Sequence, residues 1–197
     1  MIPLQSCDIL LCSGNSSTSK KIIWWQDLVG ASKEAAQLSH AALYADIKRV
    51  FESTTMNKWA DKSGVQTNGF DEWLRNYDGK VWARRLDFER TFTFEYKFEQ
   101  FMDYYIGRKY ENGIAGYLEL FLAGCRLDRF IRKVWPSYRP IATKAPHCSE
   151  LDVRALIELL LCSGKAIASR LPPYTFWPGG DFEKYLLVPI GKLERLK

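Results

Sequence analysis

The sequence lacks the cysteine pairs that a disulfide framework or a structural zinc site would need. Its five cysteines form an odd set without any Cys-x-x-Cys pair: Cys7, Cys12, Cys125, Cys148 and Cys162. Small secreted folds usually carry an even number of cysteines, and structural zinc sites usually draw on closely spaced pairs. We therefore expect free thiols, no metal site and no cofactor.

Long apolar runs and a secretory leader are also missing. No run approaches the roughly 20 apolar residues that a membrane-spanning helix needs. The first residues, MIPLQSCDILLCSG, have no basic start followed by a long apolar segment. The sequence thus predicts no transmembrane segment, no signal peptide and synthesis in the cytoplasm.

Neither a basic stripe nor an internal repeat is present. The net charge of +5 arises from 28 basic and 23 acidic residues, and the basic residues come as scattered pairs such as Lys20-Lys21 and Arg84-Arg85. A nucleic-acid binder would show a contiguous basic face, so we expect no nucleic acid partner. With 197 residues, 47% of them hydrophobic, the chain predicts one domain over residues 1–197. Nothing in the sequence indicates an oligomeric state.

The spacing of apolar residues predicts strands and helices without a regular β-α-β alternation. Strands are expected at 8–12, SHAALYAD (39–46), RVFEST (49–54), 80–86 and YLLVPI (185–190). Helices are expected at 20–29, with Ser19 as N-cap and Gly30 as stop, at 69–76, at 94–106, at 113–134 and from Cys148 to about 163–164. This order is typical of an α+β fold with a mainly antiparallel sheet packed with helices.

A cysteine at a helix start is the first candidate for chemistry. Cys148 opens the apolar run CSELDVRALIELLL, and free N–H groups at a helix N-terminus favour a thiolate. The chain has two histidines, and His147 is a poor base for Cys148 because adjacent side chains usually diverge. His40 is the better partner. A buried inert thiol and a core histidine bonded to a backbone carbonyl are the structural alternatives.

Glu52 is the expected partner of His40. If the connection between their two strands has an odd number of residues, for example 45–47, the two side chains become direct cross-strand neighbours on one face. Asp46 is a rival, but it falls in the predicted turn, where aspartate is expected for local hydrogen bonds. A thiol, a base and an orienting carboxylate are therefore available.

Other residues near these positions have structural explanations. Glu150 is expected to stabilise the helix dipole, and Ser149 with Asp152 forms a pattern typical of a capping box. Trp73 is compatible with the core or with stacking on a substrate.

The motifs around these residues resemble a known family. CDILLCSG, LSHAALYAD, VFEST, GKVWARRL, YYIGRKYE and HCSELD follow the order and approximate spacing of the circularly permuted branch of NlpC-type papain-like cysteine peptidases, the YiiX/YaeF-like group. The match spans most of the chain. The sequence departs from the family at Cys7, which usually is glycine, at Glu111 or Asn112, where aspartate is usual, and at His147, where tyrosine is frequent.

The resemblance implies a permuted papain-like fold and a catalytic triad of Cys148, His40 and Glu52. It also implies a cysteine hydrolase that cleaves an amide bond in a peptidoglycan-peptide-like substrate through a thioester intermediate. His147, Tyr110 and Ser39 adjoin the motif residues and are candidates for substrate binding.

The region around 113–146 is longer than so small a hydrolase needs, and we expect a helical insertion there, as a lid over the cleft or as part of the core. The acyl acceptor stays open, so an acyltransferase or lipid-ester hydrolase of the same fold is an alternative, as is a catalytically silent protein-binding module. A cell-wall substrate without a signal peptide would require a phage particle or another export route.

Overall fold

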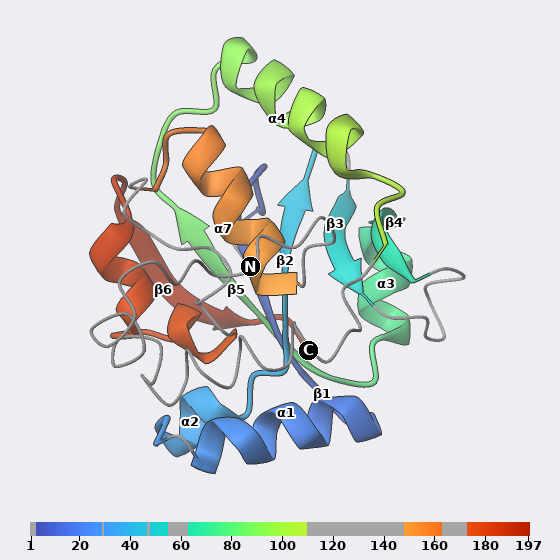
Figure 1. Ribbon diagram of the computed structural model, residues 1–197. Coiled ribbons are helices and arrows are strands. Elements are labelled where there is room, and N and C mark those ends of the chain that lie inside the picture. The colour runs from blue at the N-terminus through green and yellow to red at the C-terminus, as the bar shows by residue number, and fades with distance from the viewer. Residues whose placement is uncertain (1–2, 29, 47, 55–62, 110–147, 163–172) are drawn as a thin grey trace, which may run out of the picture.

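The computed structural model describes residues 3–28, 30–46, 48–54, 63–109, 148–162 and 173–197. Within these ranges the chain is α+β, with a six-stranded sheet packed with helices (Figure 1). The region 113–146, for which a helical insertion was expected, lies outside the described residues.

All neighbouring strands of the sheet run antiparallel, in the order β4-β3-β2-β1-β5-β6. The strands are β1 (Ile9–Gly14), β2 (His40–Ala45), β3 (Arg49–Thr54), β4 (Gly64–Gly69), β5 (Gly79–Leu86) and β6 (Ile190–Arg195). The central strand β1 is apolar on both faces because both faces are covered, which explains its continuous run ILLC.

Helices cover both faces and both ends of this sheet. They are α1 (Ser17–Leu28), α2 (Lys33–Ala36), α3 (Phe70–Asn76), α4 (Phe92–Tyr105) and α7 (Cys148–Glu158), with 3-10 turns η2 (Pro173–Phe176) and η3 (Asp181–Tyr185). In Figure 1, α1 and α2 lie at the end of the sheet where β2 begins, and α4 lies at the opposite end. None of the helices in the described ranges is both long and apolar enough to span a bilayer.

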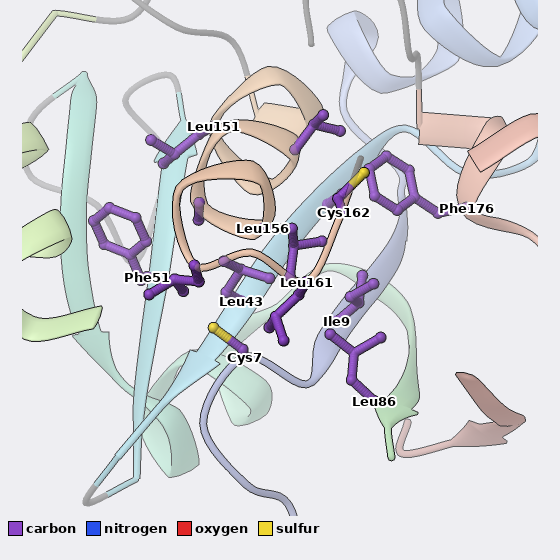
Figure 2. Packing of buried hydrophobic residues seen from close by; sticks show 14 of the residues in the cluster. Cys7, Ile9, Leu43, Phe51, Leu86, Leu151, Leu156, Leu161, Cys162 and Phe176 are labelled. Atoms are coloured by element: carbon purple, nitrogen blue, oxygen red, sulfur yellow. The ribbon is translucent and has the colours of Figure 1, made fainter. Parts of the chain in front are cut away.

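Side-chain alternation along the strands divides the core into two clusters. On one face, Leu43 and Phe51 pack against Leu151 and Leu156 of α7, as Figure 2 shows. On the other face, Val50 of β3 and Leu10 and Cys12 of β1 pack in one cluster with Trp73 of α3. Each fully buried leucine or phenylalanine contributes about 1.5–3 kcal/mol of transfer free energy, so the two clusters fix α7 and α3 on opposite sides of β2 and β3.

The last strand differs from the sequence prediction. The strand expected at 185–190 is wrong, because Tyr185 ends η3 and Leu186 forms only an isolated bridge with Cys162. Strand pairing with β5 begins at Ile190, after Pro189, which has no N–H to donate. Strand β4 was not expected at all, because GVQTNG contains a single aliphatic residue, Val65.

The helix boundaries also shift for local reasons. α1 begins before Ser19, whose backbone N–H donates to Ser16 Oγ at 3.0 Å, so Ser16 and not Ser19 provides the cap. Gly30, with φ of 84°, follows the helix end as expected. α7 ends at Glu158, earlier than predicted, and Leu160 then takes the left-handed conformation with φ of 61°.

Candidate active site

His40 and Glu52 meet at the end of the sheet where β2 begins. His40 Nε2 lies 2.7 Å from Glu52 Oε2, and the two side chains are 12% and 0% exposed. The connection spans residues 46–48 and has an odd number of residues, which keeps both side chains on one face. The expected direct pairing of His40 with Glu52 is wrong, however. Leu43 lies opposite Phe51, so the residue opposite Glu52 is Ala42, two positions after His40. The imidazole and the carboxylate meet along the diagonal, a distance that long side chains can span.

The rival carboxylate has a different partner. Asp46 forms an ion pair with Arg49, three residues along the chain, at the turn between β2 and β3. Arg49 also binds Glu99 of α4. Asp46 thus serves the turn, as the sequence analysis expected.

Cys148 is the first residue of α7, and its thiol meets His40. A side-chain hydrogen bond links the two residues, and the thiol also receives hydrogen bonds from the backbone N–H groups of Ala41 and Ser149. Glu52 occupies His40 Nε2, which leaves Nδ1 as the ring nitrogen that can serve the sulfur. β2 therefore supplies both the imidazole and one amide, while the first turn of α7 supplies the thiol and the other amide.

These contacts determine the protonation of the pair. Burial raises the pKa of Cys148, but the hydrogen bond and positive charge of His40, with the two backbone N–H groups, bring it below the ordinary thiol value. Burial lowers the pKa of His40, whereas the hydrogen bonds and charges of Cys148 and Glu52 raise it to about 10. The geometry therefore favours a thiolate beside an imidazolium ion.

Two of the other described cysteines, Cys7 and Cys12, have a pKa shifted in the opposite direction from that of Cys148. Burial raises the pKa of both Cys7 and Cys12 well above the ordinary thiol value. Cys162 is buried beside Leu186, and Cys125 lies outside the described residues. Among the described thiols for which a pKa change is resolved, Cys148 alone has a lowered value.

Glu52 has two further donors that the sequence analysis did not assign to the site. Its Oε1 accepts hydrogen bonds from Asn68 Nδ2 at 2.8 Å and from Trp73 Nε1 at 3.1 Å. Asn68 belongs to β4, a strand without a clear sequence pattern. Trp73 carries a typical signal for the core, and it is indeed buried, so nothing in its spacing indicated the hydrogen bond to Glu52.

Asp152 lies one helical turn after Cys148 and is fully buried. The expected capping box is wrong, because neither carboxyl oxygen of Asp152 has a hydrogen-bond partner among the described residues and the Ser149 N–H is directed to the Cys148 thiol. Burial raises the pKa of Asp152 well above its ordinary value, and the negative charge of Cys148 raises it further. Glu150 lies in the first turn of α7, as expected, and it also binds Arg154, with 3.0 Å between Oε1 and Nε.

The three candidate substrate-binding residues are only partly described. Ser39 is buried, and its Oγ accepts a hydrogen bond from the Gly14 N–H at 2.9 Å, which ties the start of β2 to the end of β1. His147 and Tyr110 lie outside the described residues. Over the described ranges, no three His, Cys, Asp or Glu side chains gather in an arrangement that could hold a metal ion.

Comparison with known proteins gives a likeness to a solved structure but no sequence relative. No protein-family model matches the chain, and no curated protein matches it either. The chain is similar to the crystal structure of the metalloprotein YiiX from Escherichia coli O157:H7, DUF1105. The two sequences are 15% identical, and the structures superpose with a TM-score of 0.49. The match covers 98% of this chain and 96% of that one.

Proposed function

We propose that this chain is a cysteine hydrolase with a permuted papain-like fold of the NlpC type, which cleaves an amide bond through a thioester intermediate. Cys148 is the nucleophile, His40 the base and acid, and Glu52 the residue that orients His40. One observation carries the proposal: a continuous hydrogen-bonded chain runs from the Cys148 thiol through His40 to the buried Glu52 carboxylate. The lowered pKa of Cys148 agrees with the role of a nucleophile.

In the acylation step, the Cys148 thiolate attacks the carbonyl carbon of the scissile amide. In the proposed step the backbone N–H of Cys148 stabilises the oxyanion, a role supported by the position of Cys148 at the start of α7. The His40 imidazolium then donates its proton to the leaving nitrogen, the C–N bond breaks and the amine departs. The product bound to the enzyme is a thioester on Cys148.

Deacylation uses the same residues in reverse roles. Neutral His40 takes a proton from water, the resulting hydroxide attacks the thioester carbonyl, and the C–S bond breaks to release a carboxylic acid and the Cys148 thiolate. Glu52, fixed at 2.7 Å from Nε2, holds the ring orientation and stabilises the imidazolium. Peptidoglycan-like peptides are the substrate class that the family resemblance suggests.

Selective alkylation tests the nucleophile. We expect iodoacetamide at pH 6 to 7 to modify Cys148 before the other four thiols, as located by peptide mapping. Cys7 and Cys12 are matched internal controls, because burial raises the pKa of both. The His40→Ala variant should lose the selectivity. Equal labelling of Cys148 and Cys12 in the wild-type protein would refute the proposal.

Turnover of peptidoglycan-derived peptides tests the reaction. Cys148→Ala and His40→Ala should abolish it, while Glu52→Gln should retain about tenfold to hundredfold more activity than either, because nucleophile and base remain. Turnover that persists in Cys148→Ala would exclude a cysteine hydrolase. Product release only in the presence of an added amine or lipid acceptor would instead identify an acyltransferase.

A further inference from the structure

The Glu52 carboxylate is fully enclosed by protein and accepts three hydrogen bonds. Oε2 faces His40 at 2.7 Å, and Oε1 faces Asn68 Nδ2 at 2.8 Å and Trp73 Nε1 at 3.1 Å. A buried carboxylate without water needs such donors to stay charged. Asp152, buried in the same region, has no such donor in the described ranges.

The two donors on Oε1 come from elements that are held by core packing and by strand pairing. Trp73 is buried in the core cluster between α3 and the sheet, with its ring centroid 5.2 Å from that of Tyr77 and 6.4 Å from that of Phe70. Asn68 lies opposite Val50 in the β3–β4 pairing and directly precedes Gly69, the N-cap of α3. The indole N–H and the amide therefore reach Glu52 from fixed backbone positions.

We propose that Trp73, together with Asn68, is a positioning residue of this site, which fixes the Glu52 carboxylate against His40 by binding its second oxygen. The inference deepens the proposed function and rests on it for the catalytic consequence. With Oε1 anchored, Oε2 remains aimed at Nε2 and keeps the imidazolium charged beside the thiolate. When a donor is removed, the buried carboxylate loses both its fixed orientation and part of the stabilisation of its charge, and the imidazolium becomes less stable.

The titratable groups near His40 come from the elements packed around it. They are Glu52 on β3, Cys148 and Asp152 on α7, Cys12 opposite His40 on β1, and Tyr77 at the end of α3, which is hydrogen-bonded to Cys12. Of these, Glu52 and Cys148 form the direct contacts that raise the pKa of His40.

Titration of His40 by NMR tests the proposal without any substrate. The chain has two histidines, so comparison with a His147→Gln spectrum assigns the His40 signal. The wild-type His40 should titrate with a pKa of about 10, and Trp73→Phe, which keeps a ring but loses the N–H, should lower this value by about one unit. Repeating the comparison in the Cys148→Ala background isolates the contribution of Glu52.

Two further variants make the test specific. Trp82→Phe is the matched control, since Trp82 is buried in the cluster on the other face and should leave the His40 pKa unchanged. Asn68→Ala, at a half-buried position, removes the other donor and should shift the pKa in the same direction if Trp73→Phe fails to fold. Shifts below about 0.2 units in the donor variants, or an equal shift in Trp82→Phe, would overturn the proposal. A clear shift combined with unselective labelling of Cys148 would instead count against the proposed hydrolase.

Discussion

Replacing Asp152 by asparagine should stabilise the protein at neutral pH. Asp152 is fully buried one turn after Cys148, and within the described part of the chain neither of its oxygens has a hydrogen-bond partner. Burial raises the pKa of Asp152 well above its ordinary value, with a further contribution from the charge of Cys148. The folded chain thus keeps a proton on Asp152 at pH values where the unfolded chain releases it. Asparagine has nearly the same shape and carries no such proton.

The sign and size of the effect follow from proton linkage. Below the unfolded-state pKa of about 3.9, both states of wild-type Asp152 are protonated, and the contribution of this group to stability is fully present. As the pH rises from there toward the folded-state pKa, folding loses about 1.4 kcal/mol per pH unit. At pH 7 the loss is therefore at most about 4 kcal/mol, and we expect Asp152→Asn to exceed the wild type by about 1–4 kcal/mol.

Urea unfolding followed by tryptophan fluorescence at pH 4, 5, 6, 7 and 8 measures this difference, since the chain has seven tryptophans. The two proteins should differ by less than about 1 kcal/mol at pH 4, where both bury an uncharged polar group, and diverge steadily above it. Asp103→Asn, at an exposed position on α4, should change stability by less than about 0.5 kcal/mol at every pH. A difference that does not grow with pH, or a less stable Asp152→Asn protein at pH 7, would refute the reasoning.

Two further substitutions test the packing of the fold. Gly79→Ala should destabilise the protein by about 3 kcal/mol or more in urea unfolding, because φ is 152° and an added Cβ would lie 1.9 Å from the Ser13 carbonyl oxygen. The control is Gly69→Ala, where no atom of the described residues lies within 4 Å of an added Cβ, and it should cost less than about 1 kcal/mol. Arg90→Met should cost about 3–5 kcal/mol by the same measurement, since it leaves the buried Asp8 without the guanidinium at 2.8 Å from Oδ1. Full stability of either Gly79→Ala or Arg90→Met would contradict the packing described.

The sequence predicted the middle of the sheet because its strands alternate or are continuously apolar. β1, β2, β3 and β5 all lie near their expected positions. β4 was missed, since GVQTNG derives its strand conformation from pairing with β3 rather than from its own side chains. β6 was displaced because YLLVPI is more apolar than the segment that pairs with β5, and apolar content alone cannot show which residues have a free sheet edge to join.

The candidate site was partly accessible to the same reasoning. The scarcity of histidine and the shared face of two adjacent strands led to His40 and Glu52, and their contact follows from local geometry. The donors around Glu52 depend on how α3 and β4 pack, which is tertiary information. The sequence also could not predict that Asp152 lacks a hydrogen-bond partner among the described residues. A carboxyl group three residues after a serine gives the same sequence pattern whether it caps the helix or faces the core.

Glu52 and Asp152, two buried carboxyl groups near His40, differ in the hydrogen-bond donors that surround them. Glu52 accepts three hydrogen bonds from β2, β4 and α3, whereas Asp152 accepts none from the residues that the structure describes. The same burial that would neutralise Cys148 and His40 separately strengthens their mutual attraction once both are charged, because little water screens it. A thiolate in this position therefore depends on the supporting elements as much as on its histidine. Any change that loosens α3 or the first turn of α7 should reduce the reactivity of Cys148 before it unfolds the chain.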